Sequence, residues 1–305
     1  MARLPSDILE KNSSGQALLL VLLSMAVVLT IVLSILSRSI TDVAVTTRSE
    51  EALRAFSAAE AGIERALIIG SDIPPTSLGD AEFTADVSSY AEGSNAFYYP
   101  VNILSGEAVS VWFVAHDDDE NFACSAATPC FTGDTIKVCW GKPGTPADDA
   151  TTPAVEVSVV YAQTPGDYST IQVARAAHDP NSGRSVTNSF DASDPGICTI
   201  DGKSFAFQKT IDLGAAGLDI PIASYSSENG LQFARIRMLY NSITAQPLGI
   251  DVNFAGNSVI PAQGTMIAAS GSSGESNRKI EVFRSFGEPP PIFDSALFSL
   301  GGLVK

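Results

Sequence analysis

The sequence is poor in the side chains that most enzymes use for chemistry. It contains only two histidines, His116 and His178, and has neither a GxSxG nor a CxxC motif. A nucleophilic triad and a zinc site both depend on histidine or on closely spaced cysteines, so neither is supported. We therefore expect a protein that is not an enzyme, with an extracellular hydrolase as the least favoured alternative.

Positive charge is also scarce. Lys and Arg number 18 against 34 Asp and Glu, which gives a net charge of −16. Residues 1–69 hold six basic and seven acidic residues, so residues 70–305 hold the other twelve and twenty-seven, a net −15. An acidic body of this kind repels the phosphates of nucleic acids and of anionic lipids. We expect no nucleic-acid partner and an acidic domain exposed to salt water.

Between Ala17 and Ser37 the chain has no charged residue. Fourteen of these 21 residues are Leu, Ile or Val, and a helix of this length just crosses the roughly 30 Å hydrocarbon core of a bilayer. A signal peptide has a shorter apolar core of about 7–15 residues, followed by a small-residue cleavage site that this sequence does not offer. The run predicts a single membrane-spanning helix. Its direction stays open because basic residues flank both ends.

Proline and glycine are absent from Ala17 to Ala61, which predicts that the helix continues beyond the membrane. Apolar residues then recur at the three- and four-residue spacing of one helical stripe. They are Ala52, Phe56, Ala59, Ile63 and Leu67. Gly70 and the two prolines after it end the helix. We predict one helix over residues 16–69, whose stripe packs against this chain's own domain, against neighbouring copies, or against both along different turns.

Three features of this region occur together. A short polar leader ends in Gly15, the uncharged run begins almost at once, and Leu53–Leu67 reads LRAFSAAEAGIERAL. In these roughly 70 residues the chain resembles type IV pilin-like proteins, and most closely the PilX-type minor pilins. The resemblance implies that a prepilin peptidase removes residues 1–15 as a leader and leaves Gln16 as the new amino terminus.

The same resemblance implies a structural role. Such a subunit waits in the cytoplasmic membrane with its head outside, and then joins a cell-surface filament through helix contacts with other pilin-like subunits. Major pilins carry Phe at the new terminus and Glu five positions after the cut, where this chain has Gln16 and Leu20. That Glu neutralises a terminal ammonium, since an unpaired charge in apolar surroundings is costly. Its absence favours a minor, priming or tip subunit, with Phe56, Ala59 and Ile63 as further assembly contacts.

Beyond Pro75 the hydrophobic period changes from 3.6 to 2, which predicts strands. They cover 109–114, 136–140, 155–161, 170–175, 203–213, 231–240, 248–254, 265–270 and 278–286. The predicted fold is therefore α+β: the long helix, then a β-rich, sandwich-like head over 70–305, as one domain or two smaller β subdomains. Segments 144–153 and 270–276 are rich in small and polar residues, which predicts flexible loops.

Four cysteines lie in the predicted head. An even number outside the cytosol favours two disulfides over buried thiols, and four cysteines allow three pairings. We favour a disulfide between Cys124 and Cys130, which would close a short loop. Cys139 would then pair with Cys198.

The segment HDDDEN places four carboxylates in succession, Asp117, Asp118, Asp119 and Glu120. Calcium takes six to eight oxygen ligands, and Asp-rich loops supply them. The EF-hand spacing is missing, so a solvated acidic loop is the alternative to a calcium site. No other cofactor is expected.

An alternative function belongs to the binding class. The head can be a surface adhesin or a carbohydrate-binding protein on an uncut anchor, since aromatic residues such as Trp112 and Trp140 can stack on sugars. Aromatic side chains in strands are more often core residues, however.

Overall fold

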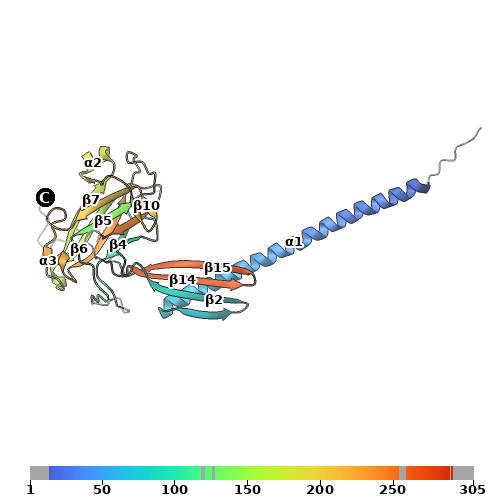
Figure 1. The fold of residues 1–305 in the computed structure, drawn as a ribbon, viewed down its shortest axis with the longest axis horizontal. Helices are drawn as coiled ribbons and strands as arrows, with labels where there is room; N and C mark the ends of the chain where they lie inside the picture. Colours follow the sequence, from blue (N-terminus) through green and yellow to red (C-terminus); the bar gives the residue numbers. More distant parts are fainter. Residues whose placement is uncertain (1–13, 118–120, 126–127, 254–258, 289, 291–305) are drawn as a thin grey trace, which may run out of the picture. The chain divides into compact units, whose positions relative to one another are not determined.

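The computed structural model describes residues 14–117, 121–125, 128–253, 259–288 and 290, with side chains from Ala17 onward (Figure 1). These residues divide into two units. The first comprises Met1–Asp86 and Ala268–Ile280, and the second comprises Val87–Ile267 and Glu281–Lys305. Within the predicted head, residues 70–86 and 268–280 therefore group with the N-terminal helix, whereas the remainder forms the second unit.

The first unit combines α1, which is the long helix Ser14–Ile69, with a four-stranded sheet. The sheet order is β1-β2-β14-β15, and the bounds are β1 Ile73–Leu78, β2 Ala81–Ser89, β14 Gly264–Ser273 and β15 Ser276–Ser285. Gly70 adopts a left-handed φ of 74° and donates its N–H to the Ala66 carbonyl. This arrangement ends α1 where the sequence predicted.

The segment 270–276 is not the flexible loop that its composition predicted. Residues 270–273 complete β14, and Ser276 begins β15, so only Gly274 and Glu275 form the turn. Gly274 has φ 54°, a conformation that glycine adopts without strain. Small, polar residues therefore form a strand here because neighbouring strands and α1 supply their partners.

The second unit is a sandwich of two sheets, as predicted. One sheet has the order β11-β5-β13-β3 and the other β4-β12-β6-β7-β8. The bounds are β3 Ala96–Tyr98, β4 Ala108–Trp112, β5 Thr135–Trp140, β6 Ala154–Ala162, β7 Ile171–Asp179, β8 Asp191–Ala192, β11 Phe207–Asp212, β12 Leu231–Leu239 and β13 Leu248–Asp251. Val138 and Trp140 of one sheet share a core with Val157 and Ile236 of the other.

A small hairpin and three short helical segments complete this unit. The hairpin joins β9 Cys198–Ile200 to β10 Lys203–Phe205 through a two-residue turn of Asp201 and Gly202, both with positive φ. The helical segments are η1 Tyr168–Thr170, α2 Ser182–Asn188 and α3 Ile222–Ser226.

Both disulfides have the predicted partners. Cys124 pairs with Cys130 across a Cα–Cα distance of 5.3 Å, and Cys139 pairs with Cys198 across 5.9 Å. The second bond ties the β9–β10 hairpin to β5, where Cys139, Cys198 and Phe205 form a small buried cluster.

Candidate functional site

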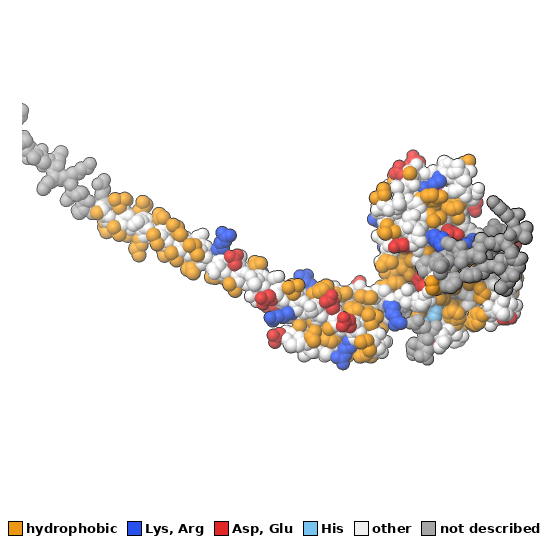
Figure 2. All heavy atoms as spheres, turned by 180° about the vertical axis from the view of Figure 1, so that it is seen from behind, with side chains coloured by type: hydrophobic (Ala, Val, Ile, Leu, Met, Phe, Trp, Pro, Cys, Tyr) orange, Lys and Arg blue, Asp and Glu red, His pale blue; other side chains and the backbone are white. Residues whose placement is uncertain are grey.

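The N-terminal half of α1 is an exposed apolar helix. Between Leu18 and Leu36 the large apolar side chains are 46% to 70% exposed, and Leu20 is 63% exposed. An 18-residue window has a mean hydropathy of 3.0 and no buried residue. Exposed apolar area costs about 25 cal/mol per Å² in water. This half of α1, orange in Figure 2, is therefore a candidate membrane anchor.

The hydroxyl groups in this half are satisfied within the helix. The Ser24 hydroxyl donates to the Val21 carbonyl at 2.9 Å, and the Thr30 hydroxyl donates to the Val27 carbonyl at 2.8 Å. Such bonds reduce the cost of placing a hydroxyl in lipid, where no water is present to accept its hydrogen bond. Ser24 and Thr30 are thus compatible with a membrane-spanning segment.

The C-terminal half of α1 packs on its sheet through small residues. Ala55, Ala58, Ala59 and Ala66 are fully buried, and Gly62 lies between them. A Cβ added to Gly62 would lie 3.0 Å from the Ala269 Cβ and 3.2 Å from the Phe83 ring. The AAEAG segment therefore lets the helix backbone lie directly against β14 and β2.

The residues predicted for processing and for assembly differ in their exposure and in whether their side chains are described. Gly15 and Gln16 lie in the first turn of α1, but their side chains are outside the described residues. Phe56 is 45% exposed, whereas Ala59 and Ile63 are 0% and 8% exposed. The assembly stripe is therefore corrected: Ala59 and Ile63 pack within their own unit, and Phe56 stays available to a neighbour.

The acidic loop is described only at its ends. The Asp117 carboxylate accepts hydrogen bonds from the backbone N–H of Asn121 at 2.8 Å and from its side chain at 3.3 Å. Asp118, Asp119 and Glu120 lie outside the described residues. Over the part of the chain that is described, no three His, Cys, Asp or Glu side chains are grouped to hold a metal ion. Calcium binding here stays a prediction.

The two tryptophans belong to the interior, as expected for strand aromatics. Trp140 is fully buried, and its indole N–H donates to the Pro153 carbonyl at 2.8 Å. Trp112 is 4% exposed, and the His116 ring lies edge-on to it at 4.6 Å. Neither ring offers a face on which a sugar could stack.

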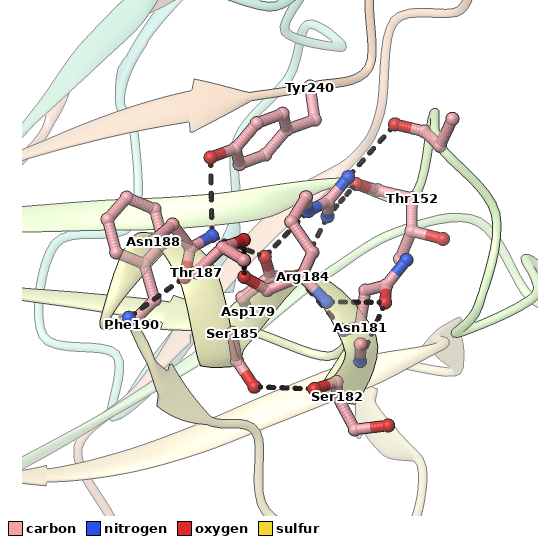
Figure 3. Close-up of polar contacts among 12 residues, drawn as sticks. Thr152, Asp179, Asn181, Ser182, Arg184, Ser185, Thr187, Asn188, Phe190 and Tyr240 are labelled. Carbon is pink, nitrogen blue, oxygen red and sulfur yellow. Dashed lines mark hydrogen bonds and ion pairs between the residues drawn. The ribbon is translucent and has the colours of Figure 1, made fainter.

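Arg184 holds an irregular loop in place (Figure 3). Its guanidinium donates two hydrogen bonds to the Asp179 carboxylate, at 2.7 and 2.8 Å, and one each to the carbonyls of Ala150 and Thr152. The Tyr240 ring lies 3.7 Å from its central carbon. The segment 144–153 has no helix or strand, but these bonds fix it, so the prediction of a flexible loop needs correction.

Asp179 is the buried partner of this network. Burial alone would raise its pKa, but hydrogen bonds from Arg184, from the Asn181 N–H and from Asn188 outweigh burial and lower the pKa below its usual range. The sequence analysis did not identify this network. The available sequence signal is Asn181, which caps α2 by accepting from the N–H groups of Gly183 and Arg184.

No protein-family model, no curated protein and no solved structure matches this chain.

Proposed function

We propose that this chain is a minor pilin-like structural subunit of a type IV pilus or a related secretion filament, anchored and assembled through α1. The observation that carries the proposal is the division of α1 into two parts. The part from Ala55 to Ala66 is fixed to a folded unit by close packing. The part from Leu18 to Leu36 makes no buried contact and needs an apolar environment.

Two environments can satisfy the exposed part of α1. Lipid chains cover it before assembly, and the apolar helices of other subunits cover it afterwards. Lipid is as apolar as leucine, so helix association in a membrane depends on packing rather than on a further hydrophobic gain. The same helix can therefore exchange lipid contacts for helix contacts, while its packed half carries the folded units along.

The absence of an acidic side chain supports a special position in the filament. Leu20 stands where a carboxylate would neutralise the terminal ammonium of the subunit ahead, and the whole segment from Ala17 to Ser37 lacks charge. A subunit without that carboxylate gains no such charge neutralisation from binding behind another subunit. We propose that it enters first and occupies the tip.

Co-expression with a prepilin peptidase tests the proposal. We expect the mass of the chain to fall by that of residues 1–15, and Gly15→Val to prevent the change. A catalytically inactive peptidase is the matched control. An unchanged mass with the active enzyme would favour the uncut adhesin instead.

Filament content supplies the second test. Purified filaments should contain this chain in few copies, at one end, as seen by gold labelling. The proposal is wrong if purified filaments never contain this chain and if their number and length do not depend on its gene.

A further inference from the structure

Two exposed aromatic rings meet on the surface of the second unit. Phe122 is 42% exposed and Tyr168 is 50% exposed, whereas every other described Phe, Tyr and Trp side chain of this unit is buried or half-buried. The centroids of the two rings lie 5.9 Å apart, although the residues are distant in the sequence. Single exposed apolar side chains are common, but neighbouring ones mark interaction sites. We call this pair of rings the aromatic patch.

Phe122 is held in place by its neighbours. It forms an isolated antiparallel bridge with His116, and its ring lies 5.3 Å from the His116 ring and 6.1 Å from the Trp112 indole. The disulfide between Cys124 and Cys130 closes the loop that follows. A side chain that is fixed in advance loses little conformational entropy when a partner binds.

Tyr168 is held by the short helix that it begins. The cap of η1 is Asp167, whose Oδ1 accepts the N–H of Ser169 at 3.0 Å and its hydroxyl at 2.6 Å. These hydrogen bonds lower the pKa of Asp167, so its carboxylate stays ionised at neutral and mildly acidic pH. Both bonds use Oδ1, so Oδ2 of this exposed carboxylate can accept hydrogen bonds from a partner beside the Tyr168 ring.

Charge in the segments that frame the aromatic patch has one sign. Phe122 follows β4 and Tyr168 follows β6, and the ends of both strands lie beside the start of β12. Lys and Arg are absent from three segments here, which are residues 66–136, 143–174 and 210–234. Arg235, the first basic residue of β12, forms an ion pair with Glu288 at 2.7 Å. These segments therefore create a negative potential, which attracts a cation.

The strength of ring–cation contacts decides which kind of cation fits. Each exposed ring strengthens the binding of a cation by about two- to fivefold, so two rings alone hold a free ammonium ion only weakly. A protein segment adds backbone and apolar contacts to the same surface. Arginine is the best cation for it, because its planar guanidinium stacks on aromatic faces and is more weakly hydrated than an ammonium group. The aromatic patch therefore fits an arginine carried by a protein.

We propose that the aromatic patch binds an arginine-bearing segment of a partner protein. The guanidinium stacks on the exposed faces of Phe122 and Tyr168, and the Asp167 carboxylate accepts its hydrogen bonds. Aromatic residues are enriched in protein interfaces, and charge pairs at the rim fix the register of the partner. This binding does not depend on the proposed filament role, and either can fail alone.

A peptide titration with the full chain in a maltoside detergent tests this surface. The probe is a peptide of three Gly-Leu-Arg repeats with a neutral fluorescent label, followed by fluorescence anisotropy at low salt. Phe122→Leu and Tyr168→Leu keep apolar bulk but remove the ring faces, so each should weaken binding about fivefold. Asp167→Asn keeps the oxygen that caps η1 and should weaken binding about threefold.

The controls separate this site from general attraction to an acidic chain. A peptide with citrulline in place of arginine keeps the shape but not the charge, and it should bind about tenfold more weakly. Ile243→Ala and Asp148→Asn change exposed residues beyond the opposite ends of β12 and β6, so they should leave binding unchanged. Melting temperatures show that each variant is folded.

Two kinds of result would overturn the proposal. In the first, the arginine peptide does not bind, or the ring variants bind it as tightly as the original chain does, so that any attraction is to the acidic surface in general. In the second, the citrulline peptide binds as tightly as the arginine peptide, which would assign the aromatic patch to a neutral, apolar partner.

Discussion

At the scale of single residues, Gly271 of β14 is the described glycine of the first unit at which an added Cβ would lie closest to another atom. A Cβ added there would collide with the Ala55 carbonyl and the Ala59 amide of α1. Overpacking of this kind typically costs about 1–3 kcal/mol. Glycine is therefore needed at this strand position for space, not for backbone conformation.

We expect Gly271→Ala to lower the free energy of unfolding by about 2 kcal/mol, measured by denaturant titration of the circular dichroism signal. The matched control is Gly183→Ala in α2, where the nearest atom to an added Cβ is 3.4 Å away. The control should be neutral or slightly stabilising. Equal effects of the two substitutions would contradict this account of α1 packing.

His178 is buried, and neither of its ring nitrogens has a hydrogen-bond partner within the described residues. Burial, helped by Lys209, lowers its pKa from 6.5 to about 4, although Asp191 and Asp194 act the other way. The unfolded chain therefore takes up this proton first as the pH falls. The stabilising contribution is complete above pH 6.5 and is lost between pH 6.5 and about 4.

Replacing His178 with Leu should remove this pH dependence. The shift from 6.5 to about 4 corresponds to at most about 3.4 kcal/mol. The unfolding free energies of the two proteins should therefore diverge by up to that amount between about pH 7 and 4. Urea titrations at several pH values measure the difference. Carboxylates such as Asp179 titrate in both proteins, so their contributions to the difference in unfolding free energy cancel. Parallel stability curves would rule out this role for His178.

At the scale of elements, α1 is covered unevenly along its C-terminal half. Ile63 is 8% exposed, while Phe56, about two turns earlier, is 45% exposed. We expect Ile63→Ala to cost about 2–4 kcal/mol of stability, the usual range for a buried Ile. Phe56→Ala should leave stability within about 0.5 kcal/mol but reduce the amount of the chain recovered in filaments. Loss of stability in both variants would contradict this difference in packing.

The loop 144–153 depends on one side chain that lies far from it in the sequence. Arg184→Met would leave the Asp179 carboxylate buried without its partner, which costs about 3 kcal/mol or more. We expect this loss in denaturant titrations, together with faster proteolytic cleavage between residues 144 and 153. Arg175→Met is the control, since Arg175 is 47% exposed and exposed ion pairs contribute little. Unchanged cleavage in the Arg184 variant would refute the role of the network.

At the scale of the whole molecule, the exposed half of α1 is the candidate membrane anchor. Two arginines at Val27 and Val28 would cost about 5–7 kcal/mol at the centre of a bilayer, comparable with what the apolar run gains by insertion. We expect alkaline extraction to release this double variant from the membrane fraction. The control variant, Val43→Arg with Val45→Arg, carries its arginines beyond the predicted span and should remain in the membrane fraction. Equal membrane retention would argue against anchoring by residues 17–37.

Local patterns were sufficient for much of the fold. A 3.6-residue period predicted α1 to its last residue, and a period of two located the predicted strands. The predicted strand 203–213 is, however, two strands in different sheets, β10 and β11. Both disulfide pairings were also predicted correctly. These features depend on backbone preferences, on solvent exposure of alternate residues and on short chain separations, all of which the sequence displays directly.

The sequence by itself determined the long apolar helix and the β-rich character of residues 70–305, because the spacing of apolar residues specifies both. Only the tertiary structure decided which face of α1 is buried, since small residues rather than the bulky stripe allow close approach to the sheet. It also decided that residues 268–280 return to α1, and that Arg184 fixes a distant loop. Each of these depends on partners far away in the chain, and no local pattern specifies them.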